Sequence, residues 1–231
     1  MREVSKQENE YRFYLLYDKV YRLDILSHAY RLVKANKGAP GIDGETFASI
    51  EEREGGAEKY LEEIARALKR KDYKPQSVRR VYIPKTAGGK RPLGIPMIKD
   101  RVVQMAVKIV IEPIFEADFQ DNSYGFRPKR SAHQAVEDVK EHLFNGKTDV
   151  IDADISKYFD TIPHDRLMQL VAKRIVDKQI RNGQKRCTRS PGGCIHSCPS
   201  DLSPIYPIPG CSISSPRQPT CSSLLSSRRD T

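Results

Sequence analysis

The chain has 231 residues, of which 38% are hydrophobic and 30% are charged, and its formal net charge is +10 at pH 7. That length allows one or two domains with a hydrophobic core. No stretch approaches the about 18–20 apolar residues of a membrane span, and the polar first ten residues lack the apolar segment of a secretion signal. We therefore expect a cytoplasmic protein that does not cross a membrane.

The positive charge is concentrated in the middle of the chain. Residues 66–130 contain 16 Lys and Arg against 6 Asp and Glu, a net charge of +10, and the flanking segments 1–65 and 131–180 are slightly acidic. A block of this kind is typical of a surface that binds a polyanion such as a nucleic acid. The alternative is a solvated basic face without a partner.

The first third of the sequence predicts two helices separated by a loop. Apolar residues recur at three- and four-residue steps over 10–35 and again over 57–70, as in amphipathic helices. Between them, the Gly- and Pro-rich run Lys37–Gly44 predicts an ordered turn or loop.

A basic hairpin is predicted next. Val78, Val81 and Ile83 indicate a strand, Thr86–Gly89 form a turn, and Lys90–Ile95 return as a second strand. Lys85 and Arg91 flank the turn on opposite arms, where the two cations could close over a triphosphate. The alternative is a surface hairpin whose basic residues prevent edge pairing.

Two further helices and a loop follow. Residues 99–118 predict a largely buried helix in which Pro113 makes a kink or an end. Ser131 and Gln134 form a capping-box pattern for a helix that reaches about Phe144. In the loop between them, Tyr124 and Phe126 can pack on bases or on the core, and Arg127, Lys129 and Arg130 can contact phosphates.

The segment Val150–Ile162 predicts a buried strand that ends in carboxylates. Asp152 and Asp154 alternate with apolar residues and share one face of the strand, and Pro163 suits the first turn of a helix over 163–176. Carboxylates at a strand end are common ligands of divalent metals. Two solvated acids on an edge strand are the alternative. The whole pattern predicts an α/β (α+β) fold in which a basic lobe packs on an acidic one.

Five motifs in this order resemble the reverse transcriptase domain of group II intron-encoded proteins, the intron maturases. They are Asn36–Gly44, Tyr82–Pro96, Asp100–Gln104, Tyr124–Pro128 and Asp152–Asp160. Diversity-generating and CRISPR-associated reverse transcriptases share these blocks, and the resemblance covers about residues 10–180. It implies a right-hand polymerase whose fingers and palm copy an RNA template into DNA, using a DNA primer, deoxynucleoside triphosphates and two Mg²⁺ ions.

The resemblance also implies roles for single residues. Asp154 matches the catalytic aspartate that binds both metals, with the backbone carbonyl of Ile155 as a further ligand. Phe159 matches the residue beneath the incoming sugar, where its bulk favours deoxynucleotides. Lys85 and Arg91 match the bases that hold the triphosphate. Template or intron RNA is expected to contact Arg79, Arg80, Arg127, Lys129 and Arg130.

We divide the chain into four segments on this basis. They are an N-terminal helical extension (1–45), fingers (46–147), a partial palm (148–180) and a tail (181–231). The tail holds all five cysteines and many Ser and Pro residues without a helical or strand period, so we expect it to be disordered. A frameshift near codon 180 is the interpretation that we favour. A zinc knuckle is disfavoured because the Cys spacings are too wide.

The second palm motif of the family is missing, because no Asp-Asp pair occurs anywhere in the sequence. The thumb and the maturase region are expected to be missing as well. Asp154 by itself does not supply enough oxygen ligands for two Mg²⁺ ions. Two functions therefore remain open: a reverse transcriptase by family, or an RNA-binding remnant of one that has no polymerase activity. A metal-dependent cyclase is disfavoured because its motif is absent.

Overall fold

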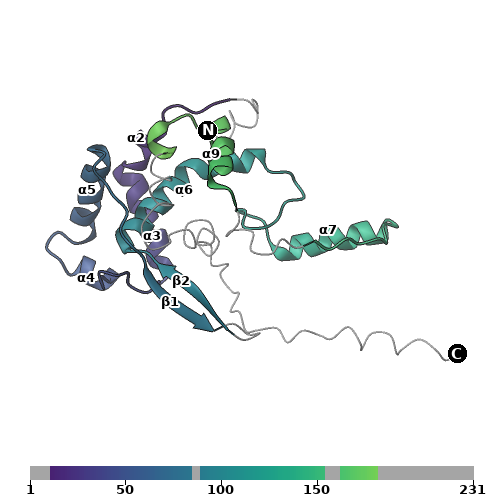
Figure 1. Ribbon diagram of the computed structural model, residues 1–231, viewed down its shortest axis with the longest axis horizontal. Helices are drawn as coiled ribbons and strands as arrows, with labels where there is room; N and C mark the ends of the chain where they lie inside the picture. The colour runs from purple at the N-terminus through teal and green to yellow at the C-terminus, as the bar shows by residue number, and fades with distance from the viewer. Residues whose placement is uncertain (1–10, 85–88, 154–161, 182–231) are drawn as a thin grey trace.

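The computed structural model describes residues 11–84, 89–153 and 162–181. Within these ranges the chain is mainly helical, with one small antiparallel sheet, which agrees with the expected α/β class (Figure 1). The elements are α2 (Tyr17–Val20), α3 (Leu23–Ala35), α4 (Phe47–Glu51), α5 (Gly56–Lys69), β1 (Arg79–Pro84), β2 (Lys90–Ile95), α6 (Ile98–Asp118), α7 (Ala132–Phe144) and α9 (His164–Arg174). None of the described helices is long and apolar enough to span a membrane.

The hydrophobic core lies where α6 packs on α2 and α3, and α5 also packs on α3. Its largest fully buried side chains come from the helices and from the segment after α9: Leu16, Val20, Leu26, Ile50, Ile64, Ile98, Val102, Ile114 and Ile175. Helix α6 is apolar on more than one face, as its sequence predicts, and so it sits at the centre of the helical body.

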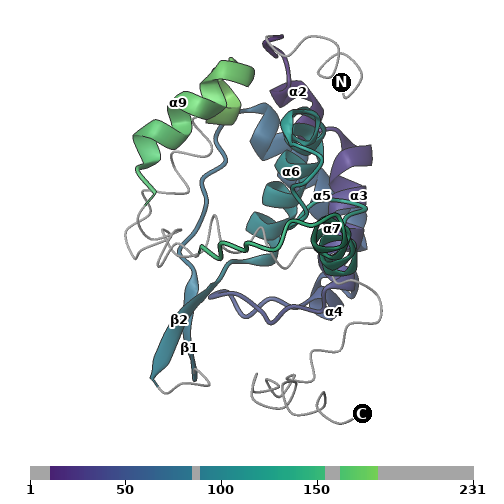
Figure 2. The same cartoon turned by 90° about the vertical axis from the view of Figure 1, so that its right-hand side faces the viewer.

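The predicted hairpin is confirmed by the pairing of β1 with β2, although Lys85–Gly88 in its turn lie outside the described residues. The register pairs Arg79 with Ile95 and Pro84 with Lys90. The return strand covers the predicted residues. The hairpin projects from the helical body in both views (Figures 1 and 2).

The single helix predicted over 10–35 is wrong at its N-terminal end. Regular α-helix begins at Tyr17 and is interrupted before Leu23, because Arg22 has an extended backbone (φ −67°, ψ 136°). Phe13 instead forms a parallel bridge with Ile175. The backbone N–H of Phe13 donates to the carbonyl of Arg174 at 2.8 Å, and the N–H of Val176 donates to the carbonyl of Phe13 at 2.9 Å. Tertiary pairing has here overridden a local helical period.

The other predicted helices are confirmed, with small differences at their ends. Helix α7 begins with the predicted capping box, in which the N–H of Gln134 donates to the Ser131 hydroxyl at 3.3 Å and the N–H of Ser131 donates to the Gln134 amide oxygen at 2.9 Å. It closes at Asn145 and at Gly146, whose φ of +85° suits glycine. Pro113 lies inside α6 and does not end it.

The buried strand predicted from Val150 is wrong for the residues that the structure describes. Val150 is 70% exposed and Ile151 is 94% exposed, and 150–153 have no regular secondary structure. Within the described ranges, the sheet contains β1 and β2 alone, and neither pairs with this segment. An apolar run without a neighbouring strand cannot become a buried strand.

The two ends of the described chain are joined by Asp177. One of its carboxylate oxygens accepts hydrogen bonds from the backbone N–H groups of Leu16 (3.0 Å) and Tyr17 (2.9 Å), which belong to the first turn of α2. The other oxygen accepts from the N–H of Gln179 at 2.9 Å. Burial alone raises the pKa of Asp177, but the N–H donors outweigh burial, and the net effect lowers the pKa.

Replacing Asp177 with Ala is expected to lower the free energy of unfolding by about 1–3 kcal/mol, because two N–H groups at the start of α2 lose their acceptor. Urea titration followed by circular dichroism measures this. The pKa of Asp177 is lower in the folded protein than in the unfolded protein. The carboxylate therefore makes its full contribution to the free energy of unfolding above the unfolded pKa. The contribution is lost as the pH falls through the folded pKa, and the difference between wild type and variant should close below pH 3.8. The exposed neighbour Lys178→Ala is the control, and an equal loss there would contradict this role.

Candidate nucleic-acid interface

The basic hairpin carries three of the predicted contact residues on its described strands. Arg79 and Arg80 open β1 and pair with Ile95 and Gly94. Arg80 is exposed and Arg79 is partly buried. On the other arm, the backbone of Arg91 lies opposite Ile83. Lys85 is outside the described residues, so the predicted juxtaposition of Lys85 and Arg91 stays a prediction.

The hairpin is tied to the helical body by a buried carboxylate at the start of α6. Asp100 is 3% exposed. It accepts a short hydrogen bond from the Tyr73 hydroxyl and a second from the backbone N–H of Gln76 at 3.1 Å. Residues 73–76 lead directly into β1. Because a buried carboxylate must be hydrogen-bonded, Asp100 fixes the position from which the hairpin starts.

The Gly- and Pro-rich loop packs against the same end of the hairpin, where the chain leaves β2. A Cβ atom on Gly41 would lie 2.7 Å from Cα of Met97, at the exit of β2. Only glycine allows this approach of two backbones. Next to it, the Arg101 guanidinium donates to the carbonyl of Ala39 at 2.6 Å, and burial lowers the pKa of that guanidinium. The first three predicted motifs therefore meet at the N-terminal end of α6.

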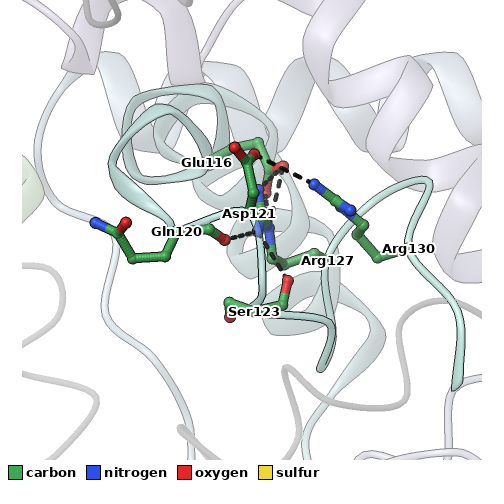
Figure 3. Close-up of polar contacts among 6 residues, drawn as sticks. All are labelled: Glu116, Gln120, Asp121, Ser123, Arg127 and Arg130. Atoms are coloured by element: carbon green, nitrogen blue, oxygen red, sulfur yellow. Dashed lines mark hydrogen bonds and ion pairs between the residues drawn. The ribbon is translucent and has the colours of Figure 1, made fainter. Parts of the chain in front are cut away.

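A second anchored loop follows the C-terminal end of α6. The side chains of Arg127 and Glu116 are only 7% and 8% exposed and form an ion pair at 2.9 Å. The Arg127 guanidinium also donates to the carbonyls of Gln120 (2.6 Å) and Ser123 (2.8 Å), and these acceptors surround it in Figure 3. Four of its five N–H groups have partners. The Glu116 carboxylate, which is hydrogen-bonded to the guanidinium, raises the pKa of Arg127.

These contacts give Arg127 a structural role in the loop 119–130. Its planar guanidinium lies 5.1 Å from the ring of Phe119 and holds the chain on both sides of the turn. Contact between Arg127 and nucleic acid stays a prediction. Sequence reasoning gave Glu116 no role, because an acid at the end of an apolar helix is usually solvated. Its position one helical turn from Pro113 and its burial become visible only in the fold.

Two residues close to Arg127 in the loop have an unusual backbone conformation and are exposed to solvent. Phe126 has φ +54° and Lys129 has φ +63°, and both are exposed. A left-handed backbone at a bulky residue costs about 1–3 kcal/mol and persists only where surrounding contacts impose it. Arg130 lies 5.4 Å from the ring of Tyr124 and 3.5 Å from the Asp121 carboxylate. Burial and a hydrogen bond to Asp138 raise the pKa of Tyr124.

The predicted catalytic residues lie outside the part of the chain that the structure describes. These are the catalytic Asp154, the further metal ligand Ile155 and the sugar-contacting Phe159; Lys85 of the hairpin turn and the cysteines of the tail also lie outside the described residues. Across the described ranges, no group of three or more His, Cys, Asp or Glu side chains could hold a metal ion. The structure therefore describes two anchored basic elements, the hairpin and the loop 119–130.

Comparison with known proteins agrees with the motifs. Residues 83–199 match the family model described as reverse transcriptase (RNA-dependent DNA polymerase), which is half of the chain. The match begins in β1 and runs past Ile180, where the composition changes. The chain therefore belongs to the reverse transcriptase family.

Curated relatives place it more closely, among the group II intron-encoded proteins and intron maturases. Protein YkfC of Escherichia coli K12 is 44% identical over 161 residues, which are 67% of this chain and 42% of YkfC. The group II intron-encoded protein LtrA of Lactococcus lactis subsp. cremoris is 39% identical over 186 residues, covering 78% of this chain and 30% of LtrA. A 91 kDa protein in the cob intron of Schizosaccharomyces pombe is 33% identical over 185 residues, with 77% and 22% covered. The chain thus spans less than half the length of these relatives.

Replacing Glu116 with Leu is expected to lower the melting temperature and to speed tryptic cleavage after Lys129 and Arg130. The variant leaves the Arg127 charge in its enclosed position without a carboxylate, and the loop loses its anchor. Adding Arg127→Met should restore the melting temperature but not the resistance to trypsin.

Asp121→Ala is the matched control. Asp121 contacts Arg130 at 3.5 Å from a fully exposed side chain, and exposed pairs of this kind contribute little. If Glu116→Leu and Asp121→Ala give the same melting temperature and the same cleavage rate, the anchoring role of Glu116 is wrong.

Proposed function

We propose that this chain is the fingers and the first part of the palm of an RNA-directed DNA polymerase of the group II intron type, and that it grips template or intron RNA. The observation that carries the proposal is the pair of basic elements fixed to the two ends of α6. Asp100 fixes the hairpin at one end, and Glu116 fixes the loop 119–130 at the other. Basic groups on rigid supports bind a phosphate backbone with little loss of conformational entropy.

The proposed RNA contacts are the exposed cations of these two elements. Arg80 of β1 and Lys129 of the loop supply charge toward phosphates, with Arg79 and Arg130 beside them. Arg127 acts mainly as a positioning residue, because Glu116 and two carbonyls already hold it. The net charge of +10 over residues 66–130 supports the same assignment.

Roles at the reaction centre are proposed from the family motifs. Asp154 is the metal-binding aspartate, the carbonyl of Ile155 is a further ligand, and Phe159 lies beneath the sugar of the incoming deoxynucleotide. Lys85 and Arg91 hold its triphosphate, with the primer 3′-hydroxyl as the attacking group. In a complete site two Mg²⁺ ions would stabilise the charge that develops on the transferred phosphate.

The residues of this sequence do not complete such a metal site. Mg²⁺ requires near-octahedral oxygen coordination, and the sequence contains no Asp-Asp pair to join Asp154. The second candidate function, an RNA-binding protein without polymerase activity, is therefore favoured for the chain as it stands. In that case the hairpin and the loop 119–130 would bind RNA, and the palm residues would be inactive.

A primer-extension assay on poly(rA)/oligo(dT) with Mg²⁺ tests the distinction. The 231-residue chain is expected to incorporate no deoxynucleotide, because the metal ligands are incomplete. Incorporation that disappears in Asp154→Ala would contradict the RNA-binding proposal and show a working polymerase site.

RNA binding is expected to weaken with salt in proportion to the number of phosphates contacted. The double variant Arg80→Ala/Lys129→Ala should flatten the plot of log affinity against log salt by about 1.4, at about 0.7 for each lost contact with a single strand. Fluorescence anisotropy with a labelled oligoribonucleotide measures this slope.

The matched control removes two exposed cations from helices outside these two elements, Arg31 of α3 and Lys59 of α5. Arg31→Ala/Lys59→Ala should leave the slope unchanged. Equal slopes for both double variants would mean that the hairpin and the loop 119–130 are not the binding surface.

A further inference from the structure

The loop 119–130 carries three aromatic rings, and two of them already have a cation beside them. Arg127 lies 5.1 Å from the ring of Phe119, and Arg130 lies 5.4 Å from the ring of Tyr124. The third ring, Phe126, is 74% exposed. Among the described residues, no cation or aromatic ring stacks on it. The loop therefore exposes the ring of Phe126 to solvent, whereas its other two rings contact arginine side chains of the same loop.

The position of Phe126 is imposed by the chain beneath it. Its φ of +54° lies in the left-handed region, which a bulky residue adopts only when its neighbours force it. The next residue is Arg127, whose guanidinium binds Glu116 and the carbonyls of Gln120 and Ser123 (Figure 3). Solvent exposure of an apolar ring in a strained but anchored backbone is unfavourable for the free chain, which points to a bound partner.

We propose that Phe126 is a stacking platform for an unpaired nucleobase of bound RNA, with Lys129 at an adjacent phosphate. This inference rests on the proposed RNA binding and adds a base contact to it. Exposed aromatic rings interleaved with cations are the usual means of holding single strands, because every base has a flat face that stacks on a ring. Because the loop is anchored, the ring is already held in position, and little conformational entropy is lost on binding.

Single-stranded RNA fits this loop better than duplex RNA does. In a duplex, the faces of the bases already stack on each other and are closed to a protein side chain. Two exposed residues three positions apart, Phe126 and Lys129, offer one contact to a base and one to a phosphate of an open strand. A protein partner that covers Phe126 by apolar contact is the competing explanation, and the tests below separate the two.

The first test compares side chains that differ in having a ring. Phe126→Leu keeps an apolar side chain but removes the ring, and we expect about a tenfold weaker affinity for an oligoadenylate of about 10 nucleotides. Phe126→Tyr keeps the ring and should retain wild-type affinity. Because stacking involves no phosphate, Phe126→Leu should leave the salt dependence unchanged.

A probe of equal length and charge, in which every base is replaced by an abasic site, isolates the base contact. On it, wild type and Phe126→Leu should bind equally. Phe144→Leu is the matched control, because Phe144 is also exposed, at 79%, but lies at the end of α7. It should bind the oligoadenylate as wild type does.

The second test observes the stacked ring directly. The sequence contains no tryptophan, so Phe126→Trp introduces a single fluorescent indole into the protein. Saturation with oligoadenylate should quench its emission, and the abasic probe should not. Phe144→Trp should show no quenching with either probe.

The outcomes separate this inference from the proposed function. If wild type binds neither probe, RNA binding itself is wrong and the stacking platform falls with it. If wild type binds the oligoadenylate while Phe126→Leu binds it equally well and Phe126→Trp is not quenched, RNA binding stands and the stacking platform is wrong. An equal loss of affinity on both probes would also overturn stacking in favour of a purely structural effect.

Discussion

Helix α6 carries a buried carboxylate near each end, and the positions of the hairpin and of the loop 119–130 depend on how these two charges are satisfied. Asp100 is 3% exposed and Glu116 is 9% exposed. They are separated by 16 residues, or about 24 Å of helix. An unpaired carboxylate in such positions would strongly destabilise the protein. Each one instead captures polar groups from a neighbouring segment, and these segments carry the basic hairpin and the loop 119–130.

This arrangement links stability and proposed function through the same contacts. The apolar faces of α6 hold α2 and α3, and so the helix cannot shift without disrupting the core. Because its two carboxylates move with it, the hairpin and the loop keep a fixed relation to the helical body. Surfaces that read an RNA strand need this kind of support, since loosely held cations lose conformational entropy on binding. The hydrogen bonds from the backbone N–H groups of Leu16 and Tyr17 to Asp177 join the two ends of the described chain in the same helical body.

Sequence reasoning succeeded where the determining interactions are local. The capping box of α7 and the pairing of two strands in a hairpin depend on residues a few positions apart, and each was predicted. It failed where a distant partner decides. Phe13 leaves a helical period to pair with Ile175, and the segment from Val150 has no described strand beside it. Likewise, no local pattern marks Glu116 as the partner of Arg127, eleven residues away. The motifs identified the family, but its catalytic aspartate lies outside the described residues.

Hydrogen–deuterium exchange of the 231-residue chain, with and without single-stranded RNA, locates the surface that binds RNA. We expect RNA to slow exchange in the hairpin strands, 79–84 and 90–95, and in the loop 119–130. Exchange in α5, which belongs to neither element, should be unchanged. Protection confined to α5 or to the N-terminal helices, with none in the hairpin or the loop, would contradict the account.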